Sequence, residues 1–331
     1  MKTITRNDGG WAISDRVLGL RTWGSRDAFA LPESADRITI GSAEGCAIRL
    51  QDAQGTVSRQ HAALERSGGV WTIRDLESKN GTYLDGERRS EFTLTPGVEI
   101  ELGRAKLIAE SARLVELRAF MERIIGWEDA RRADVDRALR SIRDTASRGT
   151  VLVLCGAGDL APTARRIHEL AFGAARPFVA AAKTVEDPAA GGTLFLSTAA
   201  RPRDIVTAQA STWRVVLGAP ARADAADLLA HLERTVVIDL PAIATRQGER
   251  ERLIAAYAQD AVRALGAPHT GFKDHDPHWL ADIELASLEA IEELARRLVA
   301  VRNWGVTHGA KKLEISQQAL AGWLRRRKIP T

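Results

Sequence analysis

Three side chains that can act on a ligand lie in one short stretch, SRQHAALERSGGVWTIRDLESKNGTYLDG, residues 58–86. Ser58 and His61 form a Ser-x-x-His, and Asn80 opens the Asn-Gly-Thr that follows. A phosphate on a side chain carries nearly two negative charges and three acceptor oxygens. A protein that reads such a group needs short donors and a cation held on loops over a rigid scaffold. The spacing therefore indicates a phosphate-reading site.

Each residue of this stretch has a role in such a site. Ser58, Arg59 and Lys79 are the donors. His61 can hydrogen-bond across the site and fix a loop rather than touch the ligand. Asn80 can hold a ligand main chain with its two-sided amide. Taken alone, a Ser-x-x-His is more simply explained by the turns of any β-sandwich, but ITIG before it and SKNGT after it favour the site.

These motifs resemble those of a forkhead-associated (FHA) domain, a β-sandwich module that binds phosphothreonine peptides. The resemblance covers residues 15–111 and rests on ITIG, the Ser-x-x-His, SKNGT and a closing VEIELG. It implies phosphopeptide contacts from Ser42, Ser58, Arg59, Lys79 and Asn80. It implies a structural role in the site for Gly41, His61, Gly81 and Thr82.

One position departs from the FHA family. The family has Gly-Arg where this chain has Gly41-Ser42, and that arginine contacts the phosphate. Losing one charge-assisted hydrogen bond costs about 1.5–3 kcal/mol, or about ten- to a hundredfold in affinity. We therefore expect weak phosphothreonine binding through Arg59 and Lys79, with less dependence on the phosphate.

Composition is that of an ordinary globular protein. Of the 331 residues, 45% are apolar and 27% are charged, which argues against wholesale disorder. No apolar run reaches the length of a membrane span, and the N-terminal MKTITRNDGGW lacks the apolar segment of a signal peptide. Cys46 and Cys155 have no Cys or His at metal spacing. We expect a cytoplasmic protein with no membrane partner, no metal and no cofactor.

The periodicity of the apolar residues predicts five segments. Residues 1–14 form a tail, and residues 15–111 show the short alternating stretches of an all-β sandwich. Residues 112–149 have helical spacing and form a linker. Residues 150–265 alternate continuous apolar runs with helical segments, which is typical of an α/β domain with a parallel sheet. Residues 275–331 are predicted to be helical.

The central segment resembles a known nucleotide-binding domain. VLVLCGAGDLAPTARRIHELAFGAARPFV, residues 151–179, and GGTLFL, residues 191–196, are similar to the AAA+ domain of sigma-54-dependent transcription activators. The resemblance implies a three-layer α/β fold for residues 150–265.

The residues for ATP hydrolysis are missing from this segment. A phosphate loop needs successive backbone N–H groups, a Lys on the phosphates and a hydroxyl on magnesium. The corresponding loop, AGDLAPT, has no Lys, Pro162 has no N–H, and Asp159 would repel phosphates. Ser197 and Thr198 replace the family's metal-binding Asp and catalytic Glu. We therefore predict a degenerate AAA+ domain, a pseudo-ATPase, and no enzyme activity.

The C-terminal segment is basic and helical. The net charge is +4, and seven Lys or Arg residues but only one acidic residue follow Val301. An i, i+3, i+4, i+7 apolar stripe predicts a long helix that ends near residues 303–305. Thr307 is the predicted cap of a short second helix, and Ser316 is the predicted cap of a third, QQALAGWLRRRK.

Two helices joined by a short turn, with polar residues opening the second and cations closing it, form helix-turn-helix geometry. The stretch resembles the Fis-type helix-turn-helix of sigma-54 activators, although Glu314 replaces its turn glycine and disfavours a left-handed turn. If so, Ser316, Gln317 and Gln318 approach base edges. Phosphates would be met by Lys311, Lys312, Arg325, Arg326, Arg327 and Lys328. The alternative is a helical bundle whose cations satisfy the last-turn carbonyls.

Together these patterns predict a signalling and transcriptional regulator. It would bind a phosphorylated protein, the substrate of a Ser/Thr kinase, through its N-terminal sandwich, and DNA through its C-terminal helices. It would have no ATPase activity, and a homodimer is compatible with it. The alternative is an FHA adaptor or scaffold without DNA binding.

Overall fold

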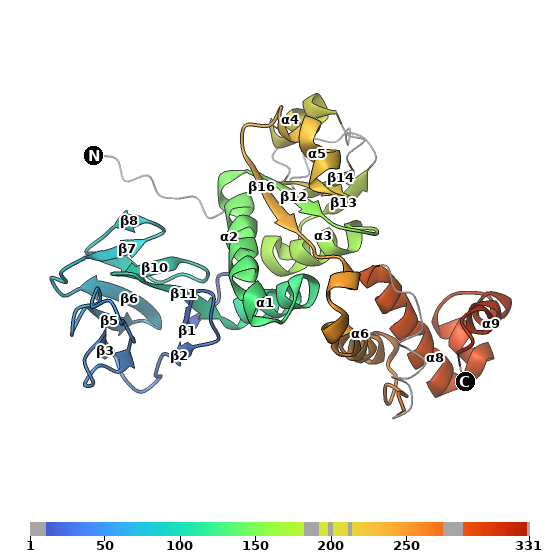
Figure 1. The fold of residues 1–331 in the computed structure, drawn as a ribbon, viewed down its shortest axis with the longest axis horizontal. Helices are drawn as coiled ribbons and strands as arrows, with labels where there is room; N and C mark the ends of the chain where they lie inside the picture. The colour runs from blue at the N-terminus through green and yellow to red at the C-terminus, as the bar shows by residue number, and fades with distance from the viewer. Residues whose placement is uncertain (1–10, 182–191, 198–200, 211–213, 274–286, 330–331) are drawn as a thin grey trace. The chain divides into compact units, whose positions relative to one another are not determined.

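The computed structural model describes residues 11–181, 192–197, 201–210, 214–273 and 287–329 (Figure 1). The chain divides into two compact units, Met1–Cys155 with Ala161–Ile238 and Gly156–Leu160 with Asp239–Thr331. The first unit holds a β-sandwich, the helical pair that follows it and a parallel sheet with its helices, and the second holds the C-terminal helices. No helix in the described ranges is long and apolar enough to cross a membrane.

The predicted N-terminal β-sandwich is confirmed. One sheet has six strands in the order β2-β1-β11-β10-β7-β8, and the other has five in the order β4-β3-β5-β6-β9. Leu20, Leu64 and Ile100 are fully buried in its core, as the period-two apolar pattern requires. The strands are β1 (Val17–Thr22), β2 (Ala28–Ala30), β3 (Arg37–Gly41), β4 (Ile48–Arg49), β5 (Ala62–Ser67), β6 (Val70–Asp75), β7 (Thr82–Leu84), β8 (Glu87–Arg88), β9 (Glu91–Thr93), β10 (Glu99–Leu102) and β11 (Ala105–Ser111).

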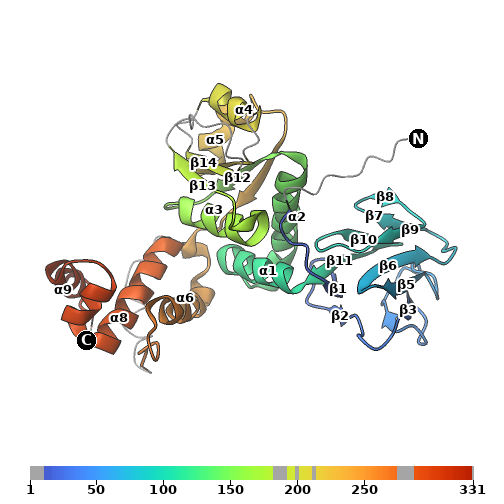
Figure 2. The same ribbon diagram turned by 180° about the vertical axis from the view of Figure 1, so that it is seen from behind.

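Two helices follow the last strand of the sandwich directly. Ser111 ends β11 and caps α1 (Ala112–Ile125) by accepting a hydrogen bond from the Leu114 N–H. A 3-10 turn, η1 (Asp129–Arg131), leads into α2 (Arg132–Arg148). Both views show α1 and α2 side by side, close to β1 and β11 (Figures 1 and 2). The predicted linker is therefore a helical pair packed on the sandwich.

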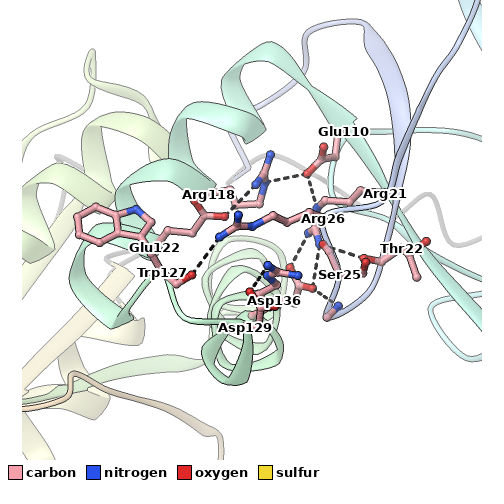
Figure 3. A network of polar contacts seen from close by, with 12 residues as sticks. Arg21, Thr22, Ser25, Arg26, Glu110, Arg118, Glu122, Trp127, Asp129 and Asp136 are labelled. Carbon is pink, nitrogen blue, oxygen red and sulfur yellow. Dashed lines mark hydrogen bonds and ion pairs between the residues drawn. The ribbon is translucent and has the colours of Figure 1, made fainter. Parts of the chain in front are cut away.

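A buried arginine joins the sandwich to α2 (Figure 3). The Arg21 guanidinium, on β1, is 3% exposed and forms a bidentate ion pair with Asp136 at 2.5 and 3.1 Å. Its Nε donates to Glu110 at 2.8 Å, and Asp136 also accepts the Gly24 N–H at 2.7 Å. Burial alone would lower the pKa of Arg21, but its hydrogen bonds to Asp136 and Glu110 raise it. The paired charges therefore fix α2 on the sandwich.

Breaking this pair should destabilise the chain strongly. Asp136→Asn replaces one of the two carboxylates that Arg21 contacts by a neutral amide, and removing one partner of a buried ion pair costs about 3–5 kcal/mol. The free energy of unfolding in urea, followed by circular dichroism, measures the loss. Glu33→Gln is the control, because Glu33 pairs with Arg16 on the exposed surface. Equal losses in the two variants would contradict a structural role for the buried pair.

The predicted α/β region with a parallel sheet is also confirmed. Its five strands lie in the order β13-β14-β15-β12-β16, and the neighbours from β13 to β12 pair in parallel. The connection from β12 runs to one edge of the sheet and that from β15 to the other, so the end of β12 is a topological switch point. The strands are β12 (Val151–Cys155), β13 (Phe178–Ala181), β14 (Thr193–Ser197), β15 (Arg214–Ala219) and β16 (Thr235–Asp239). The helices are α3 (Ala161–Ile167), its π-helical continuation η2 (His168–Gly173), α4 (Pro202–Ala210) and α5 (Arg222–Leu229).

A buried histidine joins η2, the π-helical continuation of α3, to the start of β14. His168 is 2% exposed, its Nε2 donates to the Arg176 carbonyl and its Nδ1 accepts from the Thr193 hydroxyl, both at 2.9 Å. Burial lowers the pKa of His168, so the neutral ring is favoured. His168 therefore has a structural role in this sheet.

In the second unit, α6 (Arg250–Leu265) packs against α8 (Leu288–Lys312). Leu253 and Leu294 are nearly fully buried on these helices. The predicted domain boundary after residue 265 placed α6 with the α/β domain. The structure groups α6 with the C-terminal helices instead, because α8 covers its apolar face. Two short 3-10 turns, η3 (Ile243–Thr245) and η4 (Gln247–Glu249), precede α6.

The predicted C-terminal helices are present, with a break at Gly305. This residue has φ 70° and ψ 178°, which divides α8 into two segments. The second segment begins at Val306, one residue before the predicted cap Thr307, because the break lies at Gly305. A Cβ on Gly309 would lie 3.0 Å from the Ala300 carbonyl oxygen. Glycine therefore allows the short segment to fold closely onto the long one.

A tight turn at residues 313–316 connects α8 to α9 (Gln317–Arg326). Glu314 has φ 58°, the left-handed conformation that its side chain disfavours. A hydrogen bond from the Ile315 N–H to the Ala310 carbonyl, at 3.0 Å, closes the turn around it. Glu314 thus adopts at this turn the left-handed conformation that glycine adopts most easily.

Candidate functional site

His61 joins the two loops that carry the predicted N-terminal site. Its side chain is fully buried, its Nδ1 accepts from the Ser58 N–H and its Nε2 donates to the Gly81 carbonyl, both at 3.1 Å. These partners place the ring proton on Nε2. His61 therefore positions Ser58 and Gly81 and belongs to the scaffold of the site.

The neutral form of His61 is the favoured one. Burial lowers the pKa of His61 and outweighs both the hydrogen bond to Gly81 and the attraction of Asp75, whose carboxylate lies 3.9 Å from Nε2. Protonation of Nδ1 would also remove the acceptor of the Ser58 N–H. The loop around Ser58 is therefore most stable with an uncharged ring.

Asp75 organises the second loop. Its carboxylate accepts from the hydroxyls of Ser78 and Thr82, each at 2.6 Å. Burial alone would raise the pKa of Asp75, but these hydrogen bonds lower it. The Ser78 hydroxyl oxygen accepts from the Gly81 N–H at 3.0 Å. Gly81, with φ 79°, is thus held through both its N–H and its carbonyl.

Two serines at the site use their hydroxyl groups differently. The Ser58 Oγ accepts from the Lys79 N–H at 3.0 Å and donates to no residue in the part of the chain that the structure describes. Ser42 donates its hydroxyl proton to the Val57 carbonyl at 3.1 Å. A phosphate accepts hydrogen bonds, and the Ser58 hydroxyl can donate one to it. The Ser42 hydroxyl cannot, because its proton is already donated to the Val57 carbonyl.

Asn80 and Gly41 bring the loops of the site close together. The Asn80 Nδ2 donates to the Thr56 carbonyl at 2.7 Å, which ties its loop to that of Ser58. A Cβ on Gly41 would lie 2.3 Å from the Arg59 carbonyl oxygen. Only glycine allows the end of β3 to approach the Ser58 loop so closely.

Three cations surround these loops, and one was not predicted from the sequence. Arg59 and Lys79 are exposed and form no ion pair within the described ranges. Arg88 is the third, because its guanidinium covers Gly81, where a Cβ would lie 2.6 Å from its Nε. The signal for it was the Asp-Gly turn at residues 85–86, which returns the chain antiparallel to β7.

The residues predicted to contact DNA are all exposed on the second unit. Gln317 and Gln318 open α9, and the predicted cap is confirmed, because the Ser316 Oγ accepts from the Ala319 N–H at 3.1 Å. The cations at 325–328 lie at the other end of α9, about 15 Å away at 1.5 Å per residue. They are Arg325, Arg326, Arg327 and Lys328, while Lys311 and Lys312 end α8. The Arg327 guanidinium also stacks on the Trp323 ring at 4.9 Å.

One backbone amide of the predicted degenerate phosphate loop bonds an acidic side chain. Within the second unit, the Asp159 N–H donates to the Glu289 carboxylate at 3.4 Å. The Glu289 carboxylate therefore accepts a backbone N–H that, in a phosphate loop, would be offered to the phosphate. Ser197 ends β14 with its side chain exposed, and Thr198 lies outside the described residues. The described part of the chain contains no group of His, Cys, Asp or Glu arranged to hold a metal ion.

The comparison with known proteins concerns the N-terminal domain. The FHA domain family matches residues 38–103. The oxoglutarate dehydrogenase inhibitor of Corynebacterium diphtheriae is 40% identical over 53 residues, 16% of this chain and 37% of that protein. The FHA domain-containing protein FhaB of Mycobacterium tuberculosis is 30% identical over 120 residues, 33% of this chain and 72% of FhaB. Among solved structures, the FhaA FHA domain complexed with the intracellular domain of Rv3910 is 32% identical in sequence to this chain. The match covers 27% of this chain and 96% of the FhaA domain, with a TM-score of 0.25.

The chain therefore belongs to the family of FHA domain-containing proteins. The predicted resemblance to an FHA domain is confirmed at residues 38–103, and the rest of the chain is unassigned. The chain spans 37% of the length of the oxoglutarate dehydrogenase inhibitor.

Acidification should destabilise the chain through His61. Folding lowers the pKa of this ring, so the unfolded chain binds the proton more readily. The contribution of His61 to the free energy of unfolding is fully present above the unfolded pKa of about 6.5. It falls, by up to about 1.4 kcal/mol per pH unit, as the pH drops toward the folded pKa. Urea unfolding between about pH 7.5 and 5.5 measures this slope, which should be smaller in His61→Gln.

His168 contributes with the same sign, because its pKa is also lowered by burial. His168→Gln should therefore lessen the slope by its own share, and the double variant should lessen it further. Asp75 affects stability only in a more acidic range, since its pKa lies below the ordinary value. An unchanged slope in His61→Gln would show that His61 is not held neutral by the fold.

Proposed function

We propose that the FHA domain of this chain binds phosphothreonine peptides and that the chain is a signalling protein. The observation that carries this proposal is the Ser58 hydroxyl, which donates to none of the residues that the structure describes. The exposed cations Arg59 and Lys79 belong to the same loops and form no ion pair within the described ranges. The hydrogen bonds of His61 hold this hydroxyl and the facing loop in place. Membership of the FHA family supports phosphothreonine as the ligand.

The chemistry of the site matches a dianionic phosphate. Ser58 donates a short hydrogen bond, and the cations of Arg59 and Lys79 make charge-assisted contacts. The side-chain amide oxygen of Asn80, Oδ1, receives no hydrogen bond from the described residues and can accept one from a peptide N–H. Ser42 contributes no donor, since its proton is bonded to Val57. We therefore expect phosphate-dependent binding through fewer contacts than the FHA family usually makes.

The test uses a labelled peptide selected from a library with fixed phosphothreonine, together with its unphosphorylated twin. Ser58→Ala should weaken binding of the phosphopeptide about tenfold, because a hydrogen bond to a charged group contributes about 1.5 kcal/mol or more. Ser67→Ala is the matched control, since Ser67 ends β5 at the opposite end from His61 and is exposed. Fluorescence anisotropy gives the affinities. Equal affinity for the two peptides would refute the proposal.

A second function, DNA binding, is favoured by the C-terminal helices. The short segment of α8 and α9 are joined by a tight turn, and Gln317 and Gln318 are exposed at the start of α9. Glutamine can pair with the N6 and N7 of adenine in the major groove. Lys311, Lys312 and the cations at residues 325–328 supply charge for phosphates. The rival function is that of an adaptor whose helices only dock proteins.

Replacing Arg325, Arg326 and Lys328 by Gln should flatten the salt dependence of DNA binding. Each lost phosphate contact lowers the slope of log affinity against log salt by about 0.9. Arg327 is left in place, because its stacking on Trp323 makes it part of the helix packing. Gel shifts over a salt series measure the slope, and Arg263→Gln, which removes an exposed cation of α6, is the control. Absence of retention at low salt would favour the adaptor.

We further propose that the central domain does not hydrolyse ATP. Its loop lacks the Lys that holds the β- and γ-phosphates, and the Glu289 carboxylate already bonds the Asp159 N–H. Ser197, at the end of β14, cannot hold magnesium as a carboxylate does. The end of β12 is nevertheless the switch point where α/β folds bind ligands. This supports a nucleotide fold that has lost its chemistry and serves as a platform.

A further inference from the structure

The proposed phosphothreonine site has fewer donors than a dianionic ligand can use. Ser42 donates its only hydroxyl proton to the Val57 carbonyl. The sequence motifs assign two cations to the site, Arg59 and Lys79. We infer that Arg88, on the β8 strand, is a further phosphate-binding residue of this site. This inference rests on the proposed function, since it names a residue that the same ligand would contact.

The β7–β8 hairpin brings Arg88 to the site. Residue 81 directly precedes β7, and Tyr83 of β7 pairs with Arg88 of β8. The intervening residues 85 and 86 have φ 48° and 83°, which is the left-handed pair of a tight two-residue turn. Such a short connection returns the chain beside its own starting point. Arg88 therefore lies next to the loop that carries Lys79.

The Arg88 guanidinium covers Gly81 itself. A Cβ on Gly81 would lie 2.6 Å from the Nε of Arg88 and 3.1 Å from its Cζ and from one Nη. The space that Gly81 leaves open is thus the space that the guanidinium occupies. Gly81 is held by His61 and Ser78, so the surface under Arg88 is rigid.

The charge of Arg88 has no counter-ion among the residues that the structure describes. Arg88 is exposed and forms no ion pair with any residue in the described ranges. Its neighbour Arg89, also exposed, pairs with Glu87 at 2.6 Å. Two carboxylates on either side of β7 have partners too, because Asp85 pairs with Arg143 and Asp75 accepts hydrogen bonds from Ser78 and Thr82. A bound phosphate would therefore be the counter-ion that Arg88 lacks.

A guanidinium suits this task better than an ammonium group. Its planar fork presents five donors and can bind two phosphate oxygens at once. Arg88 would approach the phosphate from the Gly81 side, while Ser58 and Lys79 approach it from their own loops. The geometry thus assigns to β8 a charge that the Gly41-Ser42 loop does not provide.

Anisotropy titrations of the full chain with the selected phosphothreonine peptide and its unphosphorylated twin test this inference. Arg88→Gln should weaken phosphopeptide binding about tenfold or more, because a charge-assisted contact is lost. It should leave binding of the twin unchanged. Arg88→Lys keeps the charge and should lose less. Arg89→Gln is the matched control, because Arg89 directly follows β8 and is exposed, and it should bind as the wild type does.

The outcomes separate the inference from the proposed function. If Ser58→Ala weakens phosphopeptide binding and Arg88→Gln does not, the role of Arg88 is wrong and the phosphothreonine site stands. If Arg88→Gln weakens both peptides equally, or lowers the melting temperature well below that of Arg89→Gln, Arg88 acts only on the structure and the inference fails. If the wild type binds both peptides equally, both proposals fail.

Discussion

The buried imidazole of His61 holds together the two loops from which most of the candidate peptide contacts of this FHA domain project. One ring nitrogen accepts from the Ser58 backbone and the other donates to Gly81, so one neutral side chain sets the spacing of the loops. Asp75 fixes the Gly81 turn through Ser78. Groups that are already held in place lose little freedom on binding. A rigid site can therefore read a phosphate with few contacts.

The sandwich that carries this site is joined firmly to the rest of the first unit. Arg21 pairs with Asp136 in the interior, and Arg143 pairs with Asp85 at 3.0 Å. Both connections end on α2, which leads directly to the first strand of the parallel sheet. Asp85 also begins the turn that precedes Arg88, so the ion pair of Asp85 with Arg143 connects α2 to the hairpin that carries Arg88. Within this unit, α2 is therefore ion-paired both with β1 and with the β7–β8 turn.

The sequence predicts the parts of this protein that depend on local patterns. Ser58 and His61 could be assigned because their spacing reflects the geometry of a single turn, and apolar periodicity indicates both the sandwich and the parallel sheet. The hydroxyl direction of Ser42 and the approach of Arg88 to the site could not, because each depends on backbone that tertiary folding brings close. Arg21 has the pattern of an ordinary strand residue, since its partner carboxylate lies 115 residues along the chain. The packing of α6 against α8 could not be predicted for the same reason, because it joins segments that are distant in the sequence.

We propose that a phosphothreonine is held between the Ser58 loop and the Lys79 loop. An experimental structure of the full chain with a bound phosphothreonine peptide tests this placement directly. We expect phosphate oxygens that accept hydrogen bonds of about 2.5–2.9 Å from the Ser58 hydroxyl and the Lys79 side chain. Asn80 should contact the peptide main chain. A phosphate that points into solvent, or a peptide bound on another face of the sandwich, would show that these two loops do not form the binding site.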